Sequence, residues 1–180
     1  MRWPMFVIVA ALLLTLQTAV APFLEIRGVR PDLLIVGVVY FALYARTRDS
    51  FIAAWVLGFC ADLMTVERIG LISFSYGLAA LCVTSVREYL FRYRMLTQFT
   101  MTLFICLLVQ TAWMVYRRVV CVPAQSILVD WSLVALPVSL YSALWAPLLH
   151  RTLLRFSRLL GIARPRYSHA GLRSLEPPDV

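Results

Sequence analysis

Residues 3–23 read WPMFVIVAALLLTLQTAVAPF, a run that contains no charged side chain. A helix needs roughly 20 such residues to cross the hydrocarbon core of a bilayer, which is about 30 Å thick. Hydrophobic residues make up 62% of the whole chain, and its mean hydropathy of +0.82 is far above that of soluble proteins. The chain is therefore predicted to be an integral membrane protein.

Apolar stretches of this kind recur along the rest of the chain, separated by short gaps that carry arginines. The six stretches are Trp3–Phe23, Leu33–Ala45, Phe51–Met64, Ile69–Val86, Phe99–Tyr116 and Ile127–Leu149. Only helices and closed barrels satisfy every backbone group in lipid, and long continuous apolar runs exclude a barrel. We therefore predict an all-α polytopic membrane protein with six transmembrane helices. The second and third stretches are short, and a polar turn is expected between them at residues 46–50.

One transmembrane domain is predicted for residues 1–161, with kinks at Pro137 and Pro147 in its last helix. This helix is expected to continue into a basic amphipathic extension, since Arg151, Arg155 and Arg158 recur at helical spacing. Such an extension binds anionic lipids at the cytoplasmic surface of a membrane. Residues 162–180 are rich in proline and polar side chains and are expected to form a disordered cytoplasmic tail.

The arginines predict the orientation of the chain, which has 17 basic residues and no lysine. If the N-terminus is cytoplasmic, the cytoplasmic side holds Arg2, Arg46, Arg48, Arg87, Arg92, Arg94, Arg151, Arg155, Arg158, Arg164, Arg166 and Arg173. The other side holds Arg27, Arg30, Arg68, Arg117 and Arg118. The positive-inside rule therefore predicts that both termini are cytoplasmic. Because the arginines lie at the ends of apolar runs and form no separate basic patch, nucleic acid is not an expected partner.

The start of the chain also has features of a signal peptide, with Arg2 before the apolar run and small residues at 19–21. The apolar run is longer than the ~7–15 residues usual in such peptides, so we expect a retained first helix.

Asp62 is the carboxylate that lies most clearly inside an apolar stretch. A charge in lipid is costly, so its surroundings must be protein, water or a partner. We favour a structural or partner-binding contact over a proton or ion relay, with Arg68 as a possible ion-pair partner. On this interpretation, Asp62→Leu should leave a folded protein that captures its partner less well.

Two further patterns have structural interpretations. Asp32 directly follows Pro31 and is expected to cap the second helix, because a carboxylate there accepts bonds from unpaired backbone N–H groups. Asp130 has a similar place near the start of the sixth stretch. Gly58 lies four residues after Ala54, a spacing of small residues that lets membrane helices approach closely but that also arises incidentally.

The sequence contains no arrangement of residues typical of an enzyme. It has no phosphate-binding glycine loop, no HExxH motif and no serine–histidine–aspartate arrangement, so catalysis, metals and cofactors are not expected.

Three short segments of the chain form a recognisable pattern. Residues 30–43 read RPDLLIVGVVYFAL, residues 58–63 read GFCADL, and residues 69–71 read IGL. They resemble the Pro-Asp-Leu segment, the Gly-x-x-x-Asp motif and the Gly-Leu step into the next helix of the rod shape-determining protein MreD family. Residues 66–68 depart from the small, proline-bearing turn expected before that step. The resemblance marks structural or partner-binding candidates, namely Pro31, Asp32, Gly58, Asp62 and Gly70.

This resemblance implies a non-catalytic component of the cell-elongation complex in the bacterial inner membrane, which helps to control cell shape and lateral peptidoglycan synthesis. The implied partners are the single-span protein MreC and, less directly, a lipid II polymerase, a transpeptidase and an actin-like filament. The implied fold is similar to the substrate-binding component of energy-coupling-factor transporters. The alternative function is therefore vitamin capture in such a transporter, with a pocket that Trp113, Tyr116 and Trp131 could line.

Overall fold

The structure is a computed structural model, and it describes residues 3–26, 28–65, 70–87, 95–120 and 134–160. The helices are α1 (Trp3–Thr15), the π-helical turn η1 (Leu16–Val20), α2 (Leu33–Tyr44), α3 (Thr47–Met64), α4 (Leu71–Val86), α5 (Met95–Val120) and α7 (Leu136–Leu160). Within these ranges the chain forms no β-strand, apart from an isolated bridge between Ile26 and Val29. The predicted all-α class is confirmed.

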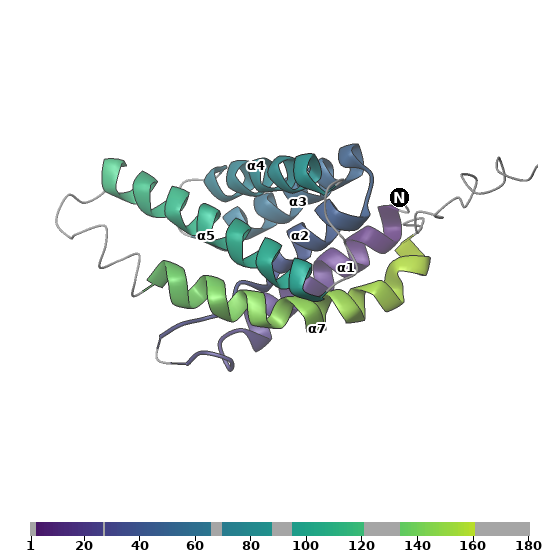
Figure 1. Ribbon diagram of the computed structural model, residues 1–180, viewed down its shortest axis with the longest axis horizontal. Helices are drawn as coiled ribbons and strands as arrows, with labels where there is room; N and C mark the ends of the chain where they lie inside the picture. The colour runs from purple at the N-terminus through teal and green to yellow at the C-terminus, as the bar shows by residue number, and fades with distance from the viewer. Residues whose placement is uncertain (1–2, 27, 66–69, 88–94, 121–133, 161–180) are drawn as a thin grey trace, which may run out of the picture.

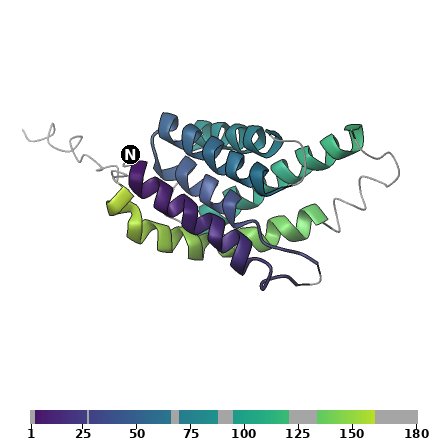
Figure 2. The same ribbon diagram turned by 180° about the vertical axis from the view of Figure 1, so that it is seen from behind.

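Helix α2 occupies the centre of the bundle, where it contacts α1, α3, α4, α5 and α7. Helix α5 crosses the bundle on one face in Figure 1, and α1 lies on the opposite face in Figure 2. Residues 33–43 of α2 are all buried. Because protein rather than lipid surrounds α2, its 12 residues, about 18 Å of helix, need not reach both membrane surfaces. This explains why the second apolar stretch is short.

Helix α3 begins earlier than the sequence indicates. The polar turn predicted at residues 46–50 is wrong, because α3 starts at Thr47 and includes Asp49 in its first turn. A carboxylate in this position is favourable beside the positive end of the helix dipole. Ser50 donates a hydrogen bond from Oγ to the carbonyl oxygen of Phe41 at 2.7 Å, which satisfies this polar group inside the bundle. With 18 residues, about 27 Å of helix, α3 is not short.

Helices α3 and α4 form an antiparallel pair packed through small residues. A Cβ atom added at Gly58 would lie 2.5 Å from Cα of Ser73, so the two backbones are in direct contact there. At Gly77 of α4, an added Cβ would lie 2.5 Å from Nε1 of Trp55. The close approach that the small-residue spacing predicts is therefore present between α3 and α4.

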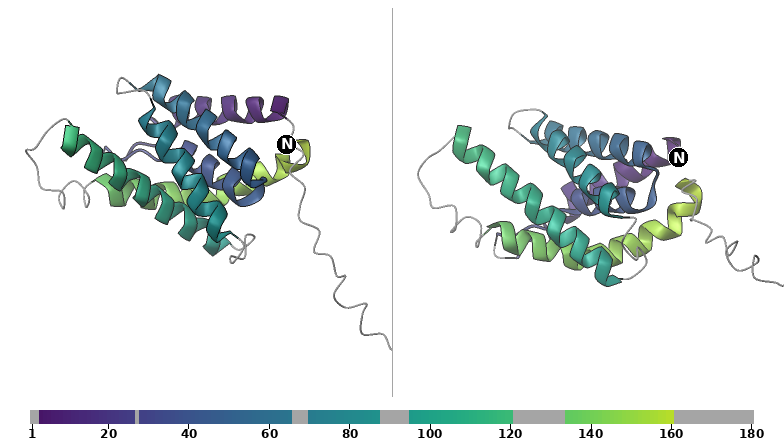
Figure 3. Two further views of the ribbon diagram at one scale, coloured as in Figure 1. Left: turned by 90° about the horizontal axis from the view of Figure 1, so that it is seen from above. Right: turned by 45° about the horizontal axis from the view of Figure 1, so that its top comes forward.

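Helix α7 packs along α5 and is visibly curved (Figure 3), with Pro147 inside it and Pro137 in its first turn. A first-turn proline costs no internal hydrogen bond, so a kink at Pro137 is not required. The predicted basic extension is a continuation of this helix to Leu160, with Arg151 and Arg155 exposed and Leu153 buried. The C-terminal end of α7 lies beside the N-terminal end of α1 in Figures 1 and 2.

Among the described residues, two helical segments are long and apolar enough to cross a membrane, Trp3–Val20 and Met95–Tyr116. Two further helices, Leu33–Tyr44 and Leu71–Val86, are apolar but shorter. The described residues are thus consistent with a membrane protein, while six separate spans stay a prediction. Residues 121–133, with Asp130 and Trp131, and the predicted tail at 162–180 lie outside the described residues.

Candidate functional site

Asp62 caps a neighbouring helix. Its Oδ1 accepts a hydrogen bond from the backbone N–H of Ile72 at 3.0 Å, and its Oδ2 accepts one from Ser73 at 2.9 Å. These N–H groups belong to the first turn of α4, where a helix has no internal acceptors for them. The carboxylate is only 1% exposed. A charge near the end of α3 is therefore satisfied by α4, and Arg68, the partner considered from the sequence, lies outside the described residues.

Gly70 makes this cap possible, because it sets the direction in which the chain enters α4. Its φ of +106° is in the left-handed region, which side-chain-bearing residues rarely adopt. Gly58 contributes at the same place, since its missing side chain lets Ser73 come close to α3. Asp62, Gly58 and Gly70 thus act together to fix the start of α4.

Asp32 caps α2, as the sequence predicts, since its Oδ1 accepts from the backbone N–H of Ile35 at 3.2 Å. The carboxylate also has a partner that the sequence does not indicate. The hydroxyl of Tyr76 on α4 donates to Oδ2 at 3.1 Å and lies 3.3 Å from Oδ1. The backbone N–H of Asp32 donates to Oγ of Ser142 on α7 at 2.8 Å. One residue therefore links the starts of α2 and α4 to α7.

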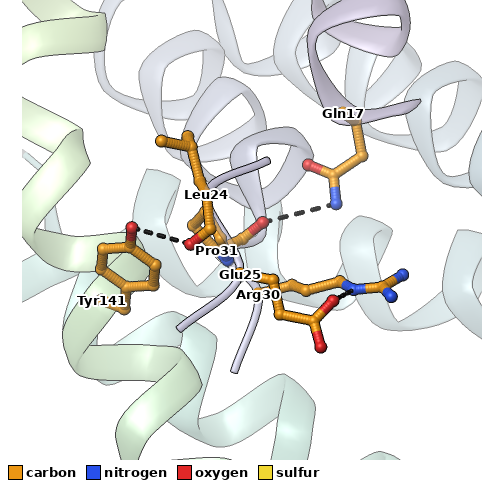
Figure 4. A network of polar contacts seen from close by, with 6 residues as sticks. All are labelled: Gln17, Leu24, Glu25, Arg30, Pro31 and Tyr141. Atoms are coloured by element: carbon orange, nitrogen blue, oxygen red, sulfur yellow. Dashed lines mark hydrogen bonds and ion pairs between the residues drawn. The ribbon is translucent and has the colours of Figure 1, made fainter. Parts of the chain in front are cut away.

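The segment that leads into α2 is held by side chains from distant helices (Figure 4). Gln17 in η1 accepts from the N–H of Leu33 at 2.7 Å, and its amide donates to the carbonyl oxygen of Pro31 at 3.5 Å. The hydroxyl of Tyr141 on α7 donates to the carbonyl oxygen of Leu24 at 2.9 Å, and Arg30 and Glu25 form an ion pair. The buried Pro31 is thus a fixed structural position.

The five residues singled out in the sequence come together in space. Pro31 and Asp32 directly precede α2, and Gly70 directly precedes α4. Gly58 and Asp62 lie in the last turns of α3. The carboxylates of Asp32 and Asp62 both contact α4. All five therefore set the geometry at one end of the α2–α3–α4 group. Whether any of them contacts a partner protein stays a prediction.

An open pocket of about 220 Å³ adjoins this end, between α4 and the C-terminal half of α5. It is lined by Asp32, Ile72, Ser75, Tyr76, Val109, Gln110 and Trp113. Trp113 thus lines a pocket, as the alternative function requires, whereas Tyr116 is not among the residues that line this one. The volume is below the roughly 300–1,000 Å³ of most sites for drug-sized ligands.

Sequence reasoning missed Tyr76, Ser142 and Arg87 as structural residues. Arg87, at the end of α4, donates hydrogen bonds to the carbonyl oxygens of Ala42 at 3.1 Å and of Ala45, and to Oγ1 of Thr47 at 2.9 Å. It therefore satisfies the C-terminal end of α2. From the sequence, Arg87 is interpreted only as one of the cytoplasmic arginines that set the orientation of the chain. Nothing in the sequence indicates its contact with α2.

Together these features describe a bundle that is all-helical in the described residues, is consistent with a membrane protein, and has helices joined by capping carboxylates. Among the described residues, no group of three or more histidine, cysteine or acidic side chains is placed to hold a metal ion. The family model described as rod shape-determining protein MreD matches residues 1–160. The chain therefore belongs to the MreD family of membrane proteins, which act in determining rod shape. No curated protein and no solved structure matches the chain, so the vitamin-capture alternative gains no support.

Proposed function

We propose that this protein is a non-catalytic, multi-pass component of the cell-elongation complex, which binds an MreC-like single-span protein in the bacterial inner membrane. The observation that carries the proposal is the family match over residues 1–160, which includes every described helix. Through this partner the protein acts on a lipid II polymerase and transpeptidase pair and on an actin-like filament, and thereby on lateral peptidoglycan synthesis.

In the proposed topology both termini are cytoplasmic. The adjacent ends of α1 and α7 in Figures 1 and 2 support this arrangement, since the first described helix then begins on the side of the bundle where the last one ends. The uneven division of the arginines supports the same direction of insertion. The exposed Arg151 and Arg155 on α7 then meet anionic lipids at the cytoplasmic surface.

In this topology, the end of the α2–α3–α4 group where Asp32 and Asp62 cap helices faces the side of the membrane opposite the cytoplasm. Both oxygens of Asp62 are bound to α4, so we assign this residue an indirect role, in which it positions the surface that a partner contacts. Pro31, Asp32, Gly58 and Gly70 have the same positioning role.

The test has a cellular and a biochemical part. In a rod-shaped bacterium depleted of its own protein of this family, expression of this chain should restore rod shape. The tagged protein should also co-purify with the single-span partner encoded in its own genome. If cells stay round at a normal protein level and no single-span protein is recovered, the proposed function is wrong.

A further inference from the structure

We propose that the pocket between α4 and α5 binds a primary ammonium group, presented by the ethanolamine headgroup of a membrane lipid. The site combines a carboxylate, an amide, a hydroxyl group and an aromatic ring, contributed by Asp32, Gln110, Ser75 and Trp113. These side chains come from three helical segments that are far apart in the sequence, so the site exists only in the folded protein.

The charge of the pocket favours a cation. Asp32 is partly buried, and no arginine among the described residues forms an ion pair with it. The nearest basic residue in the sequence, Arg30, pairs with Glu25 and is exposed. The start of α2 contributes roughly half a positive charge, which is less than the full negative charge of an ionised carboxylate. Among the described side chains the balance at the pocket is therefore negative, which favours a cation over an anionic headgroup.

The hydrogen-bonding capacity of the pocket specifies a primary ammonium. Oδ2 of Asp32 accepts one bond in the structure, from Tyr76, and a carboxylate oxygen can accept two. Gln110 has no hydrogen-bond partner among the described residues, so its amide oxygen is free to accept. Ser75 uses its proton on the carbonyl oxygen of Leu71, which leaves its lone pairs available. Three acceptors match the three donors of an ammonium group, and the Trp113 ring can add a cation–π contact.

The size and place of the pocket indicate a headgroup rather than a large free ligand. At about 220 Å³ it has room for roughly seven water-sized groups, since a water molecule takes about 30 Å³, which suits a small headgroup. The pocket adjoins α5, whose segment Met95–Tyr116 is long and apolar enough to cross a membrane and is mostly not buried, so it presents apolar surfaces beside the pocket. Acyl chains can lie against such surfaces while the headgroup enters the pocket.

Native mass spectrometry of the full-length protein in detergent can test this site with lipids of matched acyl chains. We expect phosphatidylethanolamine to bind more tightly than its mono-, di- and trimethylated forms, because each methyl group removes one donor. Asp32→Asn keeps a helix cap and removes the charge, and it should weaken phosphatidylethanolamine binding about tenfold. Gln110→Met, which keeps the side-chain size, should weaken it to a smaller extent.

The chain offers two matched controls. Asp49→Asn changes a carboxylate in the first turn of α3, at the other end of that helix from the pocket, so it should leave the lipid preference unchanged. Replacing Arg151 and Arg155 by glutamine should weaken the binding of phosphatidylglycerol and leave phosphatidylethanolamine unaffected. Thermal melting of each variant shows whether it is folded before binding is compared.

Each outcome supports or overturns the proposal. Competition by soluble ethanolamine would show that the ammonium group suffices, whereas binding of the lipid alone would show that the acyl chains are needed. Equal binding of phosphatidylethanolamine and phosphatidylcholine, a preference for phosphatidylglycerol at the pocket, or an unchanged preference in folded Asp32→Asn would overturn it.

Discussion

Replacing Asp62 by leucine tests the cap that joins α3 to α4. The substitution leaves the backbone N–H groups of Ile72 and Ser73 without acceptors, at a place where Asp62 itself is 1% exposed. A buried donor left unpaired costs about 1–3 kcal/mol, so two such donors cost about 3 kcal/mol even near the lower end of that range. For a protein of this size about 1 kcal/mol corresponds to ~2–4 °C, which gives a decrease in melting temperature of about 6–12 °C.

The assay is thermal melting of the purified protein in detergent, followed by intrinsic fluorescence. Asp62→Asn keeps one oxygen that can accept a hydrogen bond, so its decrease should be roughly half as large. Asp62→Leu with a melting temperature equal to that of the wild type would refute the cap. Together with weaker capture of the partner, that result would instead support the sequence-based expectation that the residue acts in partner binding.

Three further predictions concern packing, a second helix end and topology. Gly58→Ala places a Cβ 2.5 Å from Cα of Ser73 and should lower the stability by about 1–3 kcal/mol in the same melting assay. Phe59→Leu, on the exposed face of α3, is the control and should have little effect. Arg87→Met removes the donors that satisfy the C-terminal end of α2 and should lower the free energy of unfolding by about 2 kcal/mol. Arg87→Lys should retain part of this stability. Equal melting temperatures of the two variants would contradict the role of the guanidinium group. Reporter fusions at Arg92 and after residue 160 should both give cytoplasmic signals, and an external signal at either position would overturn the proposed topology.

Part of the fold follows from local sequence alone. Long apolar runs predict helices because backbone polar groups in lipid must be satisfied within the segment. The Pro31–Asp32 pair predicts the start of α2, because a capping carboxylate needs only the N–H groups two or three residues further along the chain. The spacing of Gly58 from Ala54 likewise indicates a close helix contact, although it does not name α4 as the partner helix.

Only the tertiary structure decides which helix is central and what the buried carboxylates contact. In a membrane protein the surface that faces lipid is as apolar as the surface that faces other helices, so hydropathy cannot distinguish the buried α2 from the outer helices. The second contact of Asp32, with Tyr76, spans 44 residues, and the pocket joins Asp32 to Gln110 across an even longer separation. Such contacts depend on how the helices pack, which no local pattern of residues specifies.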